Sequence, residues 1–262
     1  MNDGSGSVTT FASSENGAVA WGIARTTLAA ETVPSLRRPT AAARGRAAMR
    51  RLAAPLPPWW PTAVVIAAAA GYAAYFAYFT ILAHDNGHTR AYDLGIFDNL
   101  HWNIVNGGPF LKASPAHGPD GSHFGRHATL FAYVIAPFYA LAPGARTLLV
   151  IQAIIVGAGA LPLYLLARRR LGSAPQACAL ALLYLLYAPL HGSNLYDFHF
   201  LTLAPTFLFL VAYAADSDRP RLTVLAVVLA LSVREDLAVG VAVIGAWKLL
   251  DGDHARPRLG VT

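Results

Sequence analysis

Hydrophobic residues occur in long blocks along this chain. Residues 61–82 contain no charged side chain, and neither do residues 147–167. Each block is close to the roughly 20 residues that a helix needs to cross a bilayer. The pattern therefore predicts a membrane-spanning helix in each range.

Later apolar blocks predict further crossings. Residues 176–190 are predicted to cross outward and residues 201–215 to return, and residues 222–250 are divided by Arg234, Glu235 and Asp236. Charges are costly at the centre of a spanning helix, which favours a turn at this triplet and a crossing by each half. Residues 57–250 are thus predicted to form an all-α integral membrane domain, a multi-pass helical bundle with about six spans.

A shorter block at residues 128–143 is interrupted by Pro137 and Pro143. The next block ends in three arginines at residues 168–170, which are expected to face the cytoplasm. The chain must then already be outside at residue 147, so residues 128–143 are predicted not to cross. Residues 83–146 become a long first external loop that carries juxtamembrane helices.

Composition supports a membrane location. The 262 residues are 55% hydrophobic and only 13% charged, with a mean hydropathy of +0.44, whereas soluble domains carry about 25% charged residues. The net charge of +6 comes mainly from basic residues beside apolar segments, which argues against a nucleic-acid partner. The single cysteine, Cys178, excludes an intrachain disulfide.

The N-terminal residues 1–56 are rich in Ala, Ser, Gly, Thr and Arg, and are predicted to be a disordered tail. Their arginines precede the first apolar block, which places this tail in the cytoplasm of a plasma-membrane protein. Residues 251–262 are predicted to be a second cytoplasmic tail. They contain no closing element, so the chain is expected to be the N-terminal portion of a longer protein.

The first candidate chemistry lies in the external loop, in a predicted amphipathic helix. Asp98 and His101 are three residues apart and would share a helix face, whereas Asp93 and Asp98 would not. A carboxylate on the outer face suits a general base or a ligand for a divalent metal ion. The alternative is a juxtamembrane helix whose polar face lies in water.

His123 and His127 have the i, i+4 spacing of zinc ligands on a helix. Phe124 occupies the position where the zinc metalloprotease motif needs a glutamate, which argues against a protease of that class. The alternative is a pair of interfacial histidines before an apolar segment. The metal candidates are therefore Asp93, His123 and His127, with no metal identified.

Two later segments also contain candidate residues. Asp197 and His199 lie two apart in a short external loop, so in an extended backbone both could face one substrate or metal; the alternative is an aromatic belt with incidental polar residues. Arg234, Glu235 and Asp236 suit contact with a lipid phosphate or pyrophosphate. The alternative for them is a simple polar turn.

Several sequence runs resemble a known family. They are YDLGIFDNLHWN, HFGRHATLFAYVIAPFYAL, LPLYLLARRRLGS, NLYDFHF and VREDLAVG. In this order they resemble a prokaryotic multi-pass membrane family catalogued as domain of unknown function 2079, over about residues 91–250. That family is distantly similar to the GT-C class of membrane glycosyltransferases, which take sugars from polyprenyl-phosphate donors at an external site.

The resemblance implies a role for Asp93 as catalytic base or metal ligand, and a turn at residues 234–236 near the donor phosphate. It also implies that residues 128–143 are juxtamembrane. The sequence departs from the GT-C pattern in having no clear second acidic residue beside Asp93.

The leading hypothesis is a GT-C-like transferase that uses a polyprenyl-phosphate sugar. Asp93 would be catalytic, and the substrate-binding candidates are Asp98, His101, Asp197, His199, Arg234, Glu235 and Asp236. One rival is a transporter or lipid-handling protein, in which residues 234–236 would lie at the membrane midplane. Another is a non-catalytic assembly subunit.

Overall fold

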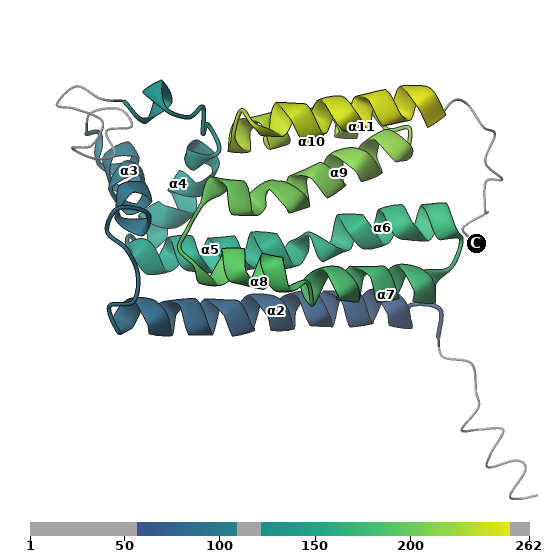
Figure 1. Ribbon diagram of the computed structural model, residues 1–262, viewed down its shortest axis with the longest axis horizontal. Helices are drawn as coiled ribbons and strands as arrows, with labels where there is room; N and C mark the ends of the chain where they lie inside the picture. Colours follow the sequence, from purple (N-terminus) through teal and green to yellow (C-terminus); the bar gives the residue numbers. More distant parts are fainter. Residues whose placement is uncertain (1–56, 109–121, 252–262) are drawn as a thin grey trace, which may run out of the picture. The chain divides into compact units, whose positions relative to one another are not determined.

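The computed structural model describes residues 57–108 and 122–251 (Figure 1). Within these ranges every secondary-structure element is helical. The predicted N-terminal tail, the loop residues 109–121 and the end of the chain after Asp251 lie outside the described residues.

Among the described residues, two helices are long and apolar enough to cross a membrane. The first is α2, Trp60–Asp85, which begins with a proline in its first turn, where the missing N–H would have had no partner within the helix. The second is the range Ala145–Leu171, made of α5 (Ala145–Ala158) and α6 (Ala160–Leu171). The two charge-free blocks of the sequence are thus both helical.

Close packing of α2 against α5 depends on a small residue at Gly157. A Cβ atom at this position would lie 2.8 Å from the carbonyl oxygen of Ala69 and 3.2 Å from the ring of Tyr72. Both of these residues belong to α2, so only glycine lets the two helices approach this closely.

The next helices form a bent pair. The helices α7 (Ala174–Leu185) and α8 (Ala188–Leu195) differ in direction by 44° across the short break between them. Pro189 lies in the first turn of α8, where proline is compatible with a helix start. If the pair is one broken span, the number of candidate spans rises from two to three.

The remaining apolar helices are shorter. The 3₁₀ helix η3 (Phe200–Leu203) leads into α9 (Ala204–Asp216), which is followed by α10 (Pro220–Val233) and α11 (Leu237–Asp251). A helix of about 14 residues is about 21 Å long, against about 30 Å for a hydrocarbon core. Because length does not decide whether they cross, the count of about six spans stays a prediction.

Short elements cover one end of the bundle, where α2 ends (Figure 1). They are α3 (Leu94–Asn106), the 3₁₀ helix η2 (His123–Gly125) and α4 (Ala132–Leu141). With ten residues, α4 is about 15 Å long. That residues 128–143 do not cross stays a prediction.

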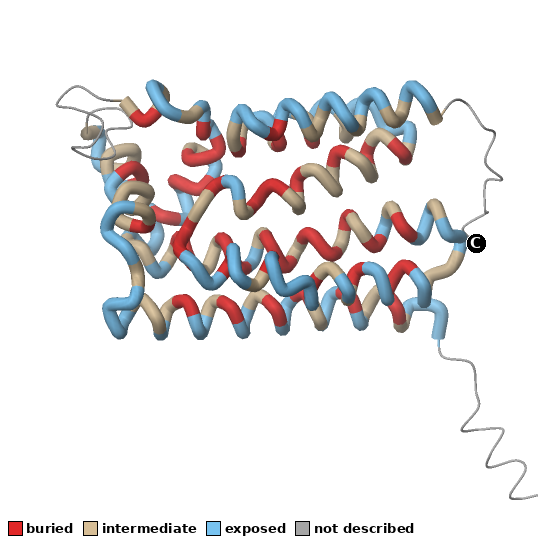
Figure 2. Tube along the Cα trace, in the orientation of Figure 1, coloured by how far each residue is buried: buried red, intermediate tan, exposed pale blue. Residues whose placement is uncertain are grey.

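Buried side chains face inward and large apolar side chains face outward. Buried positions lie on the inner faces of α2, α5, α6, α7 and α9 (Figure 2). The helix α10 also buries Ala226, Ala230 and Val233, whereas α11 buries Leu237 near its start. On α2 the outward residues include Ile66, Tyr75 and Tyr78, each more than half exposed. Large apolar side chains exposed along one helix are typical of a surface that contacts lipid or another protein.

Ion pairs join the helices at the other end of the bundle, here called the arginine end. Asp216 at the end of α9 is fully buried and pairs with Arg169 at 3.0 Å and with Arg170 at 2.6 Å, both from the end of α6. Arg170 also pairs with Asp251 of α11 at 2.8 Å. The opposite end, where α3, η2 and the start of η3 lie, is called the histidine end below.

Candidate functional site

Asp93 lies directly before the first residue of α3, at the histidine end. Its Oδ2 accepts a hydrogen bond of 2.9 Å from the hydroxyl of Tyr196, and its Oδ1 lies 3.6 Å from Nε2 of His199. The hydrogen bond to Asp93 raises the pKa of Tyr196, so the phenol remains a donor at neutral pH. Two sequence candidates, Asp93 and His199, therefore meet across the fold.

Arg90 connects the same two segments a second time. Its guanidinium donates a 2.5 Å hydrogen bond to the Tyr196 hydroxyl and lies 4.9 Å from the centre of the Tyr196 ring. Its backbone N–H donates to Oδ2 of Asp197 at 3.0 Å. Arg90 thus binds Asp197 through its backbone N–H, and through its guanidinium it binds Tyr196, whose hydroxyl donates to Asp93.

Asp197 is the buried carboxylate of this cluster. It is almost completely shielded from solvent, and this burial raises its pKa, although the hydrogen bond from Arg90 acts in the opposite direction. Its Oδ1 has no hydrogen-bond partner within the described ranges. A carboxylate in this environment holds a proton more readily than an exposed one.

Gln152 of α5 holds the loop that carries Asp197 and His199. Its amide nitrogen donates to the carbonyl oxygens of Asp197 at 3.2 Å and Asn194 at 3.4 Å, and its amide oxygen accepts from the backbone N–H of His199 at 2.8 Å. Gln152 is fully buried. Because both the nitrogen and the oxygen of this buried amide are bonded, Gln152 fixes the backbone of the loop against α5.

A second polar group lies where α10 meets α11. Glu235 accepts 2.8 Å hydrogen bonds from the ring of His127 and from the backbone N–H of Ala128. Desolvation would raise the pKa of Glu235, but these hydrogen bonds outweigh it and lower the pKa to about 2. Glu235 therefore stays ionised and binds the segment after η2 to the turn at residues 234–236.

The other two residues of the triplet pair with each other. The guanidinium of Arg234 lies 2.7 Å from Oδ2 of Asp236. Next to this turn, the backbone N–H of Phe131 donates to the carbonyl of Ser232 at 2.7 Å. The triplet thus lies at the end of α10, in contact with the segment before α4.

Asp98 and His101 have a different environment from Asp93. The hydroxyl of Tyr139 donates to the Asp98 carboxylate at 2.7 Å, which joins α3 to α4. His101 is fully buried beside Phe200, and burial lowers its pKa to about 4. His101 therefore packs beneath the cluster as a neutral ring.

Aromatic contacts link the two polar groups. The ring of Phe97 lies 5.8 Å from the rings of both His199 and His123. His123 in turn lies 6.1 Å from His127, which binds Glu235. The external-loop candidates, the Asp197 loop and the Glu235 turn are therefore neighbours at one end of the bundle.

A metal site does not emerge from these residues. Within residues 57–108 and 122–251, no three His, Cys, Asp or Glu side chains are grouped so that they could hold a metal ion. Asp93 contacts Tyr196 and His199, whereas His127 contacts Glu235. A metal at Asp93, His123 or His127 stays a prediction.

Sequence reasoning did not select Arg90, Tyr196, Gln152 or Tyr139 as site residues. Arg90 and Tyr196 stand within or beside the motif runs, but nothing in the sequence indicates that they meet. Gln152 did carry a signal, because a polar amide inside an otherwise apolar spanning block needs internal partners.

Comparison with known proteins gives one match. Residues 83–261 match the model of a family described as "Predicted membrane protein (DUF2079)", and this range contains every candidate site residue. No curated protein and no solved structure matches the chain.

Proposed function

We propose, for a chain that belongs to the DUF2079 family of predicted membrane proteins, a multi-pass location in the plasma membrane with the N-terminal tail in the cytoplasm. The support is the outward apolar surface of α2, α10 and α11 together with the separation of charges. Arg169 and Arg170 lie at one end of the bundle, and Asp93 and His199 at the other. The positive-inside rule then assigns the arginine end to the cytoplasm.

This location requires α10 and α11 to cross as a short pair. Their 14 and 15 residues give helices of about 21 and 22 Å, which is less than the usual hydrocarbon thickness of about 30 Å. Local thinning of the bilayer accommodates such mismatch at modest cost. The charged triplet at residues 234–236 would then reach the outer interface instead of the hydrocarbon.

The proposed activity is GT-C-like glycosyl transfer from a polyprenyl-phosphate-linked sugar to a cell-envelope acceptor at the outer face. The observation that carries this proposal is the meeting of Asp93 with His199 and Tyr196, contributed by a segment far along the chain. A hydrogen-bonded carboxylate beside an imidazole is suited to accept a proton from a hydroxyl group.

In this reaction the acceptor hydroxyl oxygen forms a bond to the anomeric carbon of the sugar. The bond from that carbon to the phosphate oxygen breaks, and the lipid phosphate leaves with the electron pair. The acceptor proton passes to the carboxylate of Asp93, which Tyr196 and His199 keep in position. No step is assigned to a metal ion, because the described residues form no group of three suitable ligands.

Two guanidinium groups are candidates for the donor phosphate. Arg234 is the sequence candidate, but it is already paired with Asp236. Arg90 lies next to the proposed base through Tyr196. Asp197 and Glu235 are proposed to position these segments, with Asp98 and His101 forming the support beneath them.

The place of the charged triplet favours a transferase over a transport pathway. A transporter would need Arg234, Glu235 and Asp236 near the membrane midplane. Glu235 instead binds His127 and the backbone of Ala128, both outside the long helices. This arrangement supports an interfacial site.

The test is transfer by the full-length protein incubated with labelled polyprenyl-phosphate sugars. Asp93→Asn should reduce transfer by about a hundredfold or more, in line with the loss of a general base. The matched control is Asp218→Asn, an exposed carboxylate at the arginine end. Absence of transfer with every donor, or full activity in Asp93→Asn, would reject the proposal.

A further inference from the structure

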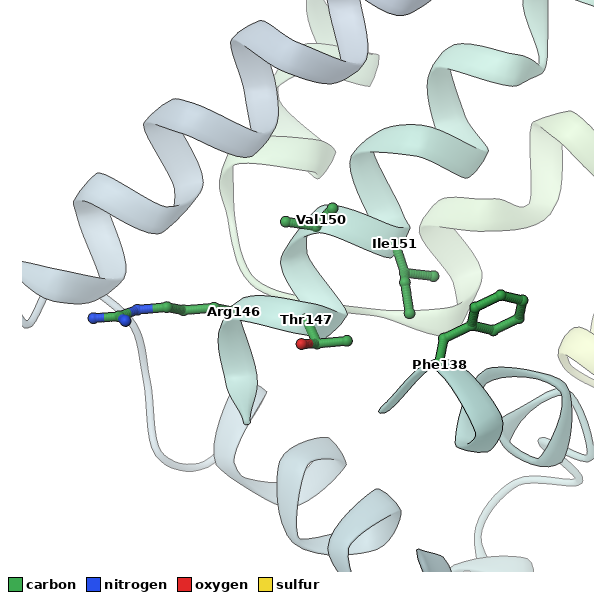
Figure 3. Close-up of a pocket in the computed structure, with 5 residues that line it drawn as sticks. All are labelled: Phe138, Arg146, Thr147, Val150 and Ile151. Atoms are coloured by element: carbon green, nitrogen blue, oxygen red, sulfur yellow. The ribbon is translucent and has the colours of Figure 1, made fainter. Parts of the chain in front are cut away.

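A groove lies beside the first two turns of α5 (Figure 3). Its lining does not include Asp93, Tyr196 or His199. Phe138 of α4 lines one side, and the side chains of Arg146, Thr147, Val150 and Ile151 of α5 line the other. The lining is almost entirely apolar, and the cavity volume is about 190 Å³. Thr147 does not offer its hydroxyl to the groove, because it donates a hydrogen bond to the carbonyl of Ala142.

The size of the groove selects the type of occupant. Pockets that enclose a whole drug-sized ligand measure roughly 300 to 1,000 Å³. A smaller, open and apolar groove suits one segment of a hydrocarbon chain.

The apolar surface continues beyond the groove along α5. Ile154 lies three residues after Ile151, on the same side of the helix, and is half exposed. From Arg146 to Ile154 the helix rises about 12 Å. On the other side Phe138 is 60% exposed. A chain in the groove would therefore have an apolar path along the helix in the direction of the bilayer core.

Arg146 supplies a cation at the start of this path. It stands in the first turn of α5, and Figure 3 shows its side chain extending away from Phe138. Its guanidinium pairs with Asp85 at 2.8 Å, and both side chains are well exposed. Exposed pairs of this kind contribute little to stability, so an anion can share or replace Asp85 at little cost. The N-terminus of α5 adds partial positive charge for the same anion.

We propose that this groove binds an anionic phospholipid of the bilayer, with one hydrocarbon chain against Phe138, Val150 and Ile151 and the phosphate on Arg146. The inference needs the membrane location of the chain but not the transferase chemistry. A failure to detect glycosyl transfer would therefore not contradict the lipid-binding proposal.

The experiment measures lipid retained by the purified full-length protein by native mass spectrometry after exchange from detergent micelles containing phosphatidylglycerol or phosphatidylcholine. The wild-type protein should retain phosphatidylglycerol in preference to phosphatidylcholine. Arg146→Gln should lower this retention about fivefold, the loss expected for one basic residue at a lipid surface. Val150→Trp, which fills the groove, should reduce it without changing the charge.

Two controls separate the site from general electrostatics. Arg126→Gln removes an exposed arginine at the same end of the bundle and should leave retention unchanged. Asp85→Asn removes the partner of Arg146 and should leave phosphatidylglycerol retained at least as well as in the wild type. If Asp85→Asn and Arg146→Gln lower phosphatidylglycerol retention equally, retention depends on the Asp85–Arg146 ion pair and not on a free cation, and the proposal is wrong.

A competition experiment with glycerol 1-phosphate, a headgroup without a hydrocarbon chain, completes the test. Glycerol 1-phosphate should not displace phosphatidylglycerol, because the groove contributes through the hydrocarbon chain. Displacement of phosphatidylglycerol by glycerol 1-phosphate would overturn the proposal. So would a result in which the wild-type protein and Arg146→Gln each retain phosphatidylglycerol and phosphatidylcholine equally.

Discussion

The hydroxyl of Tyr196 donates a 2.9 Å hydrogen bond to Oδ2 of Asp93, although 103 residues separate the two in the sequence. The same hydroxyl accepts a hydrogen bond from Arg90. Tyr196 thus joins the loop after α2 to the loop after α8 through two hydrogen bonds on one hydroxyl.

Tyr196→Phe should lower the rate of glycosyl transfer about tenfold or more, because a hydrogen bond to a charged group contributes about 1.5 to 3 kcal/mol. The amount of protein in the membrane should change little, since the ring remains. Transfer assays and quantitative blotting measure the two effects. Tyr187→Phe, at an exposed tyrosine, is the control; an equal loss of rate there would contradict the assignment.

Single-cysteine labelling tests the orientation. In a Cys178→Ala background, a cysteine introduced by Arg126→Cys at the histidine end should react with a membrane-impermeant maleimide in intact cells. A cysteine introduced by Arg219→Cys, at the start of α10, should react only after permeabilisation. The reverse pattern would invert the proposed topology and put the candidate site in the cytoplasm.

Gln152→Leu should destabilise the protein. The substitution leaves the carbonyls of Asn194 and Asp197 and the N–H of His199 without their partner, and each buried group left unsatisfied costs about 1 to 3 kcal/mol. The melting temperature of the detergent-solubilised protein is the measurement. Gln176→Leu changes the same residue type at an exposed position and should leave the melting temperature nearly unchanged.

Stability should fall between about pH 6.5 and pH 4 because of His101. Burial lowers the pKa of this residue, which lies outside the proposed spans, from 6.5 to about 4. In this window the unfolded chain takes up a proton and the folded chain does not, so acidification favours unfolding. His101→Phe should flatten the dependence of melting temperature on pH. His88→Phe, at an exposed histidine, should not; equal slopes in all three proteins would refute the explanation.

Asp216→Asn should weaken the arginine end. The buried carboxylate neutralises Arg169 and Arg170, whose side chains are 44% and 26% exposed, so its removal should cost less than the about 3 to 5 kcal/mol typical of a fully buried pair. The melting temperature should fall by several degrees. Asp218→Asn, which removes the partner of Lys248 at an exposed site, should have a much smaller effect. Similar effects of the two substitutions would show that burial of Asp216 contributes nothing.

The sequence was a good guide to the individual helices. The apolar blocks at residues 61–82 and 147–167 correspond to the helices Trp60–Asp85 and Ala145–Leu171. The charged triplet at residues 234–236 separates α10 from α11, as expected. These features are local, because a run of apolar residues or a cluster of charges marks a helix or its end without knowledge of its neighbours.

The site was predictable only as separate fragments. Asp93, Asp197 and His199 were each selected for their chemistry, but the sequence offered no clear acidic partner for Asp93. The fold places Asp197 near Asp93, and Arg90 binds both Asp197 and Tyr196, the hydrogen-bond donor to Asp93. Which residues meet depends on how the helices pack, and packing is a property of the complete bundle.

By itself, the sequence determined that this is a helical membrane protein with an arginine-rich segment after its second long apolar block, because bilayer thickness and the cost of charge in hydrocarbon act on each segment separately. Only the tertiary structure decided that Asp93 meets Tyr196 and His199 and that Glu235 binds His127. It also decided that Gln152 supports the loop that carries Asp197 and His199. These contacts join segments distant in sequence, and they exist only once close packing of the helices has brought their ends together.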